Sequence, residues 1–149
     1  LAWRILGESS EAEDIVQAAF IKLFEAKKYD GKSALSTYMH TIVTRLCLDK
    51  LRISASHKLD YGFEFDELVS DGKLSPIESL EKKQSDSNVQ HAMQFLNARQ
   101  RAALALWAYH DASISEIAKA TGLEVNAAHQ LLHRAKINLR KKMEQLGYE

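Results

Sequence analysis

The apolar positions of this chain recur at helical spacing along most of its 149 residues. Apolar side chains that lie three and four residues apart share one face of an α-helix. This spacing predicts helices within the ranges 10–25, 36–52, 87–96, 103–107 and 125–139, and residues 1–6 resemble the end of a further helix that Gly7 stops. The pattern therefore predicts an all-α protein.

The helix over 10–25 has a predicted start and two distinct faces. Ser10, followed three residues later by Glu13, has the form of a capping box. A broad apolar face is predicted from Ile15, Val16, Ala19, Phe20, Leu23 and Phe24. Asp14, Gln17 and Ile21 lie on the opposite face. Ile21 is either a docking point for a partner or a single exposed aliphatic side chain, and the spacing does not choose between them.

The composition of residues 59–86 differs from that of its flanks. This segment contains the only proline of the chain, two glycines and scattered serines and aspartates, a composition typical of a linker. Residues 59–96 carry three basic against eight acidic side chains, whereas both flanks are weakly basic. We therefore predict two small helical domains, residues 1–58 and 87–149, joined by an acidic linker.

Composition limits the functional classes. The formal net charge is zero, which is unusual for a nucleic-acid-binding protein, although both predicted domains are slightly basic. The single cysteine, Cys47, excludes a disulfide within the chain and is expected in the core. Because the chain contains no export signal and no apolar run long enough to span a membrane, we expect a cytoplasmic protein. It begins with Leu1, as expected for a processed or trimmed product.

Residues 113–143 have the pattern of a helix-turn-helix. Gly122 permits the positive φ of a short turn. The second helix has an apolar stripe at Val125, Ala128, Leu132, Ala135 and Leu139. Its other side carries Asn126, Gln130, His133 and Arg134, with His129 and Lys136 at the margin. These side chains can bond to base edges and phosphates in a major groove, but an ordinary helical hairpin with a solvated polar face has the same pattern.

The helix over 36–52 presents a second strip with nucleic-acid chemistry. Arg45 and Arg52 can each neutralise a phosphate. The loop before this helix is flanked by Tyr29 and Tyr38, which can stack on an unpaired base or belong to the protein core.

The sequence offers little for catalysis or cofactor binding. His129 and His133 are spaced for a shared metal, but neither the Glu of a zincin nor a third ligand accompanies them. The sequence contains no phosphate-binding Gly-rich loop and no recognisable nucleophile signature. We expect neither an enzyme, nor a cofactor, nor a metal site.

Two motif blocks in order resemble a known family. The first is "EAEDIVQAAFIKLFE" followed by "SALSTYMHTIVTRLCLDKLR", and the second is "SISEIAKATGLEVNAAHQLLHRAKINLRKKM". Together they resemble bacterial RNA polymerase sigma factors of the sigma-70 family, and more narrowly the extracytoplasmic-function (ECF) class, which keeps regions 2 and 4. The resemblance implies a region 2 bundle whose N-terminal helix is incomplete here, and a region 4 helix-turn-helix.

The resemblance implies a role for specific residues. Core RNA polymerase would be bound by Asp14, Gln17 and Ile21. The minus-ten element of promoter DNA would be melted and held by Ser33, Ala34, Leu35, Ser36, Tyr38, Arg45, Asp49 and Arg52. The minus-thirty-five element would be read by Asn126, His129, Gln130, His133 and Arg134, with Arg99 and Arg101 as phosphate anchors. An anti-sigma factor is a further implied partner, and no membrane is.

The chain departs from the family pattern at several of these positions. Ala18 replaces an acidic residue, Tyr38 a tryptophan and Arg45 an asparagine. His129 and Leu131 replace a basic pair in the second helix of the helix-turn-helix. Two other functions therefore stay open: a free-standing helix-turn-helix regulator, and a sigma-like protein that acts mainly by binding an anti-sigma partner.

Overall fold

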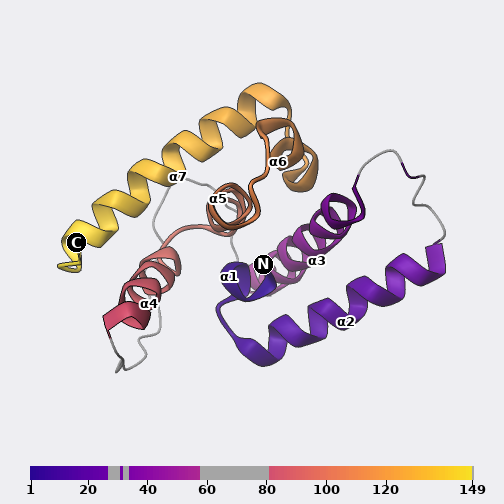
Figure 1. Cartoon of the computed structure of the whole chain (residues 1–149), viewed down its shortest axis with the longest axis horizontal. Coiled ribbons are helices and arrows are strands. Elements are labelled where there is room, and N and C mark those ends of the chain that lie inside the picture. The colour runs from indigo at the N-terminus through magenta and orange to yellow at the C-terminus, as the bar shows by residue number, and fades with distance from the viewer. Residues whose placement is uncertain (27–30, 32–33, 58–80, 149) are drawn as a thin grey trace.

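The all-α prediction is confirmed for the part of the chain that the structure describes. The structure, a computed structural model, describes residues 1–26, 31, 34–57 and 81–148. Within these residues it contains no strand and the helices α1 (Ala2–Leu6), α2 (Ser9–Ala26), α3 (Leu35–His57), α4 (Glu81–Met93), α5 (Ala98–His110), α6 (Ile114–Thr121) and α7 (Val125–Gln145), which Figure 1 shows. Most of the predicted linker lies outside the described residues, but α4 begins at Glu81, inside the range 59–86.

The helices form two groups with separate cores. Helices α1, α2 and α3 enclose one core, which contains Ile5, Ile15, Ala19, Val43 and Cys47. Helices α4 to α7 enclose the other, which contains Met93, Leu96, Leu106, Ile117 and Leu132. Cys47 is fully buried, as predicted, and burial raises the pKa of its thiol to about 12. We call the two groups the N-terminal module (α1–α3) and the C-terminal module (α4–α7).

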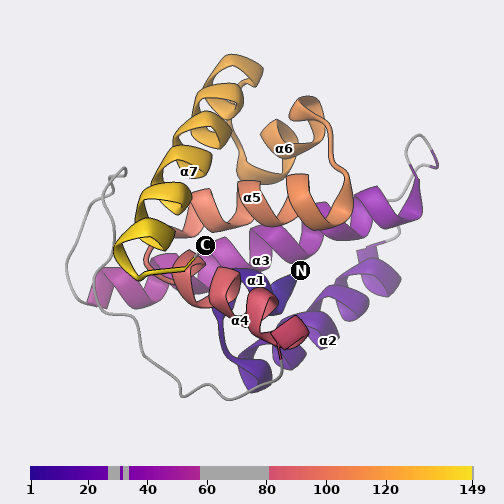
Figure 2. The ribbon, with the colours of Figure 1, turned by 60° about the vertical axis from the view of Figure 1, so that its left-hand side comes forward.

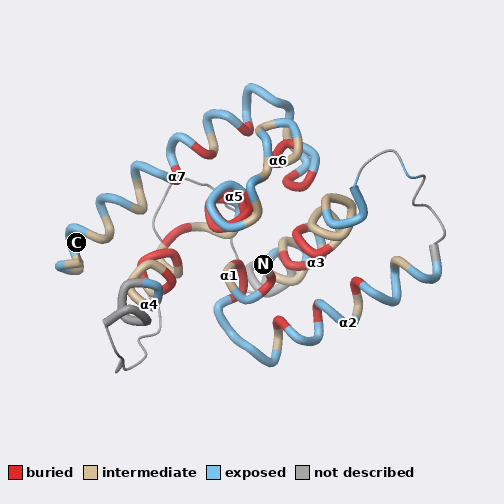
Figure 3. The backbone as a smooth tube through the Cα atoms, viewed as in Figure 1, coloured by how far each residue is buried: buried red, intermediate tan, exposed pale blue. Residues whose placement is uncertain are grey.

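Helix α5 joins the two cores. All residues from 100 to 106 are buried, so this stretch has no solvent-facing side. Figure 3 shows α5 end-on, between α7 and α1. Ala102 belongs to the core of the N-terminal module, and its neighbour Ala103 belongs to the core of the C-terminal module. Alanines let helices approach from both sides, and a helix that is apolar all round must be enclosed. The two modules therefore pack against each other along α5.

The predicted phosphate anchor Arg101 is part of this interface. Its Nε donates a hydrogen bond to the carbonyl oxygen of Ile5 at 2.6 Å, and its Nη1 donates to the carbonyl of Leu96 at 2.6 Å. The side chain is buried, and burial lowers the pKa of its guanidinium to about 10. The prediction that Arg101 anchors a phosphate is wrong in this structure, because a buried guanidinium that bonds to two carbonyls cannot reach DNA. Arg99, the other predicted anchor, is exposed.

The cap at the start of α2 differs from the predicted one. Glu8, and not Ser10, caps α2: the Glu8 carboxylate accepts a hydrogen bond from the backbone N–H of Glu11 at 2.8 Å, and the Ser10 hydroxyl donates to the same carboxylate. The capping box predicted from Ser10 and Glu13 is therefore wrong. Ser113 and Glu116 form a complete capping box at the start of α6.

The predicted apolar face of α2 is buried only in part. Ile15 and Ala19 are buried, whereas Val16, Phe20 and Phe24 are exposed, Phe24 by 73%. Helix α2 packs against α1 and α3 on one side only, so a face as wide as the predicted one cannot be covered. We call Val16, Phe20 and Phe24 the apolar stripe of α2. No helix in the described ranges is long and apolar enough to cross a membrane.

Replacement of Arg101 tests the interface between the modules. We expect Arg101→Ala to lower the free energy of unfolding by about 2 to 3 kcal/mol, because it leaves two buried carbonyls without a donor and opens a cavity. Chemical denaturation followed by circular dichroism measures this change. Arg99→Ala, a change of the same type at an exposed site two residues away, should alter stability by less than about 0.5 kcal/mol. Equal effects of the two changes would contradict the structural role of Arg101.

Candidate polymerase and nucleic-acid interfaces

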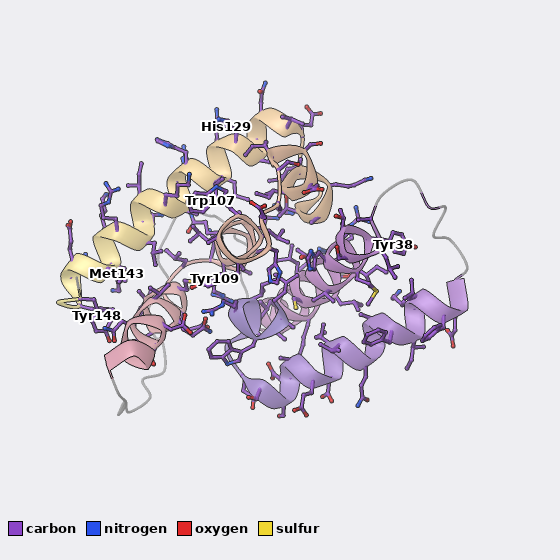
Figure 4. All side chains as sticks on the ribbon, viewed as in Figure 1. Tyr38, Trp107, Tyr109, His129, Met143 and Tyr148 are labelled. Carbon is purple, nitrogen blue, oxygen red and sulfur yellow. The ribbon has the colours of Figure 1, made fainter. Side chains whose placement is uncertain are left out.

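The polar face of α7 is exposed along the predicted reading strip. Ala128, Leu132 and Ala135 are buried against α5 and α6, which turns the opposite side of the helix to solvent. The exposed side chains there are those of Asn126, His129, Gln130, His133 and Arg134. Figure 4 shows His129 on the outer side of α7. The second helix of the helix-turn-helix thus offers hydrogen-bonding side chains on a convex surface, as major-groove recognition requires.

The turn and the first helix hold α7 in position. Gly122 ends α6 in the left-handed conformation with a φ of 75°, as predicted for the turn. The Nζ of Lys136 lies 3.9 Å from the centroid of the Trp107 ring on α5, so this margin residue faces the protein. At the far end of α7, the Tyr148 hydroxyl is 2.8 Å from Nδ1 of His91 on α4. These contacts fix α7 at both ends, so its polar face does not need to be ordered on binding.

The strip of α3 predicted to contact the minus-ten element is partly engaged by the protein itself. Arg45 donates a hydrogen bond from Nη2 to the carbonyl oxygen of Lys119 on α6 at 2.8 Å. Asp49 and Arg52, further along α3, form an exposed ion pair with each other at 3.2 Å. All three side chains are exposed, and Arg45 is in addition bonded to the C-terminal module.

The start of α3 is largely accessible. Ala34, Leu35 and Ser36 are exposed, and Tyr38 is half-buried near that end of the helix (Figure 4). Ser33 and Tyr29 lie outside the described residues. The contact zone predicted for a flipped base therefore remains a prediction, carried by the accessible residues at the start of α3.

The three residues predicted to bind polymerase lie together on the exposed side of α2. Asp14, Gln17 and Ile21 are all exposed, Ile21 by 55%. Beside them runs the apolar stripe of α2, in which the Phe20 and Phe24 rings stack with centroids 6.5 Å apart. The exposed side of α2 is therefore a continuous surface that combines one carboxylate, one amide and several apolar side chains. Such a mixture is typical of protein-protein interfaces.

Several residues that connect the modules had no signal in the sequence. Arg4 on α1 forms an ion pair with Asp86 on α4 at 3.2 Å, and its guanidinium lies 3.7 Å from the centroid of the Tyr109 ring. Gln90 donates from Nε2 to the carbonyl oxygen of Trp3 at 3.3 Å. The partners in the first and last of these contacts are more than 80 residues apart in sequence. Because helical periodicity reports only which face is apolar, it cannot pair residues at such separations.

Comparison with known families agrees with this arrangement of two modules. A family profile described as Sigma-70 region 2 matches residues 1–57, and one described as Sigma-70, region 4 matches residues 86–139. The chain belongs to the sigma-70 family of RNA polymerase sigma factors. Curated relatives place it in the ECF class, so it is a transcription initiation factor and not an enzyme.

Similar proteins cover nearly all of the chain. It is 27% identical to the ECF RNA polymerase sigma factor SigW of Bacillus subtilis, over 98% of this chain and 82% of SigW. It is 26% identical to SigE of Mycolicibacterium smegmatis and 30% identical to SigG of Mycobacterium tuberculosis, over 94% and 92% of this chain. The chain spans 54% of that SigE and 43% of that SigG, so it corresponds to about half of these longer relatives.

One solved structure has the same fold over both modules. The sigma factor RpoE of Bartonella quintana, in complex with the anti-sigma factor NepR, matches with a TM-score of 0.68. The match covers 96% of this chain and 87% of that chain at 18% identity. At this identity the match shows a shared fold.

The described residues contain no group of three or more His, Cys, Asp or Glu side chains placed to hold a metal ion. His129 and His133, the pair with the spacing of metal ligands, are both exposed on α7. Their positions fit the reading strip of α7 described above.

Proposed function

We propose that this chain directs core RNA polymerase to promoters through three surfaces, one for the polymerase and two for DNA. The observation that carries the proposal is the exposed polar face of α7, which the helix-turn-helix presents in the same chain as a region 2 module. The polymerase supplies the chemistry of transcription, and the sigma factor supplies position.

The polymerase surface lies on the exposed side of α2. Asp14 provides a charge, Gln17 a hydrogen-bonding amide and Ile21 an apolar contact that loses water on docking. An exposed aliphatic residue flanked by polar groups is a suitable anchor, because its burial is favourable and the polar groups fix its orientation. Ala18 replaces the acidic residue of the family on the same helix, so this polymerase surface carries one fewer negative charge.

The minus-ten surface lies at the start of α3 and along its exposed strip. Leu35, Ser36 and Tyr38 are placed to hold an unstacked base, and Arg45 and Arg52 to bind phosphates. Tyr38 keeps the ring needed for stacking where family members carry a tryptophan. Because salt screens charges, added salt should weaken the arginine–phosphate contacts more than the stacking of Tyr38 on the base.

The minus-thirty-five surface is the polar face of α7. Asn126 and Gln130 can form paired hydrogen bonds with adenine, and Arg134 can form them with guanine. Arg99, at the start of α5, is exposed and can bind a phosphate. Because both DNA-binding modules belong to one chain, binding of one raises the effective concentration of the other, so neither needs high affinity alone.

Run-off transcription tests the proposal. The purified chain is mixed with core RNA polymerase and a pool of templates that carry randomised promoters, and transcripts are sequenced. The proposal predicts transcripts that start at fixed positions and share upstream sequences, which are absent without the chain. If the chain binds DNA but no initiation depends on it, the free-standing regulator is the better interpretation.

Substitutions on α2 test the polymerase surface. We expect Asp14→Ala and Gln17→Ala each to weaken binding to core polymerase by about 1 to 2 kcal/mol, as loss of an interface anchor does. Biolayer interferometry measures the affinity, and circular dichroism checks that the helices persist. Glu144→Ala, which removes a carboxylate at an exposed site on α7, is the matched control. Unchanged affinity in both variants would assign docking to another surface.

Substitution of an arginine on α7 tests base recognition. We expect Arg134→Ala to weaken binding to the selected upstream element by about 1 to 3 kcal/mol and to relax selectivity at one base pair. Arg140→Ala, the same change at an exposed site six residues further along α7, should leave the base preference unchanged. Binding competitions with mutated elements separate these outcomes. If both variants lose affinity without any change in base preference, Arg134 contacts a phosphate and not a base.

An anti-sigma factor is a second partner that one observation favours. The apolar stripe of α2 exposes Phe20 and Phe24 to water, and the solved neighbour RpoE was crystallised with an anti-sigma factor. A partner that covers this stripe would bury aromatic area next to the polymerase surface and compete with polymerase for it.

We place the chain in the cytoplasm, where promoter DNA and polymerase are found.

A further inference from the structure

The two modules meet where the start of α3 lies beside α6 and the end of α5 (Figures 1 and 2). A cavity of about 230 Å³ lies in this seam, and its lining includes Thr37, His40 and Thr41 from α3 together with His110, Asp111 and Glu116 from the other module. We call this contact region the seam. Most of the side chains that line the cavity are polar, unlike those in the contacts along α5.

The seam also engages one residue of the DNA-binding strip proposed for α3. Arg45 is exposed, but its Nη2 donates a hydrogen bond to the carbonyl oxygen of Lys119 on α6. A guanidinium engaged in this way has one donor fewer for a phosphate. Opening of the seam would release this donor, which is how the seam bears on the function proposed above.

Two histidines face each other across the seam. The rings of His40 and His110 have centroids 4.5 Å apart and are inclined by 58°. Neutral imidazoles pack favourably at this distance, whereas two imidazolium ions repel each other. Burial lowers the pKa of both rings; His40 contributes to the shift at His110, whose pKa is about 4.

Other charged groups around the pair act in both directions. Glu116 on α6 raises the pKa of His40. Arg4 on α1 lowers the pKa of His110. Asp111 borders the cavity, and Arg45 and Lys119 join α3 and α6 through a backbone carbonyl. Burial is the largest cause at both histidines, so the closed seam favours the neutral pair despite Glu116.

We propose that His40 and His110 form a proton-sensitive latch: the neutral pair holds the two modules closed, and protonation opens the seam and releases Arg45 from its hydrogen bond to α6. The latch is a property of the free chain. Its consequence for promoter binding rests on the function proposed above.

The direction of the pH effect follows from linkage. In the open chain each histidine titrates near its ordinary pKa of about 6.5, whereas in the closed chain its pKa is lower. Protons therefore bind the open state more tightly. The contribution of the pair to closure is complete above about pH 6.5 and is lost as the pH falls toward about 4.

The size of the effect can be bounded. A pKa of about 4 for closed His110 corresponds to a shift of the open-to-closed ratio by up to about 30-fold between about pH 7.5 and about pH 5. Because both rings are partly exposed, solvent screening reduces the expected change to roughly tenfold.

The distance between the modules in the free chain tests the proposal. Fluorescent donor and acceptor dyes are attached to cysteines introduced by Lys22→Cys on α2 and Lys141→Cys on α7, both at exposed sites. Cys47 is fully buried and does not compete for the dyes. We expect the ratio of open to closed molecules to rise roughly tenfold between about pH 7.5 and about pH 5 while the helical circular dichroism is retained.

Histidine variants separate the latch from a general effect of acid. The double change His40→Gln and His110→Gln should abolish most of the pH response, because glutamine keeps polarity without titrating. His129→Gln, a histidine on the exposed face of α7, should respond to pH as the unmodified chain does. If the double variant is unfolded at neutral pH, His110→Gln alone should still reduce the response by more than half.

Two results would overturn the latch: no change of the distance with pH in the unmodified chain, or an unchanged response in the histidine variants. Because the assay contains neither DNA nor polymerase, its outcome is independent of the run-off experiment. Loss of promoter-dependent initiation together with a pH-dependent distance would reject the proposed function and keep the latch.

Discussion

The structure depends on the enclosure of α5 by two sets of helices. Each alanine of its central stretch removes little area from water by itself, but together they let two helical modules approach a single helix from opposite sides. A buried guanidinium, that of Arg101, completes the contact by supplying donors to carbonyls of both modules. Burial of this charge is costly unless its hydrogen bonds are satisfied, so the contact has strict geometric requirements.

The packing of the two modules leaves the three proposed binding surfaces accessible to different degrees. The polar face of α7 and the exposed side of α2 point away from the interface between the modules, so both are available in the closed chain. The strip of α3 is divided: Asp49 and Arg52 face solvent, while Arg45 is bonded to α6. In the function proposed above, the surfaces on α2 and α7 are therefore free in the closed chain, whereas one donor of the α3 surface is already engaged.

The neutral net charge has a structural counterpart. Two arginines that could add to a basic surface are engaged within the protein: Arg101 is buried, and Arg4 is paired with Asp86. The reading face of α7 contains two histidines and two amide side chains beside its single arginine. In the function proposed above, this composition makes hydrogen bonds to bases more important than phosphate neutralisation for the α7 surface.

Local patterns in the sequence predicted most of the helices, the glycine turn at Gly122, the burial of Cys47 and the polar face of α7. These features depend on side chains within a few residues of one another, and helical spacing reports them directly. The same patterns gave wrong predictions where a neighbouring helix determines whether a side chain is buried. Phe20 and Phe24 were expected in a buried face and are exposed, because α1 and α3 cover only one side of α2.

The sequence by itself therefore determined an all-α chain with two sigma-like motif blocks and a helix-turn-helix. The polar face of its second helix can be predicted from the spacing of the polar residues. Only the tertiary structure decided that the two modules pack together, that Arg101 is internal, and that His40 meets His110. The physical reason is sequence separation: the hydrogen bond from Arg101 to Ile5 joins residues 96 positions apart, and the one from Arg45 to Lys119 spans 74. Periodicity fixes which face of a helix is apolar, but which helix covers that face depends on the packing of the whole chain.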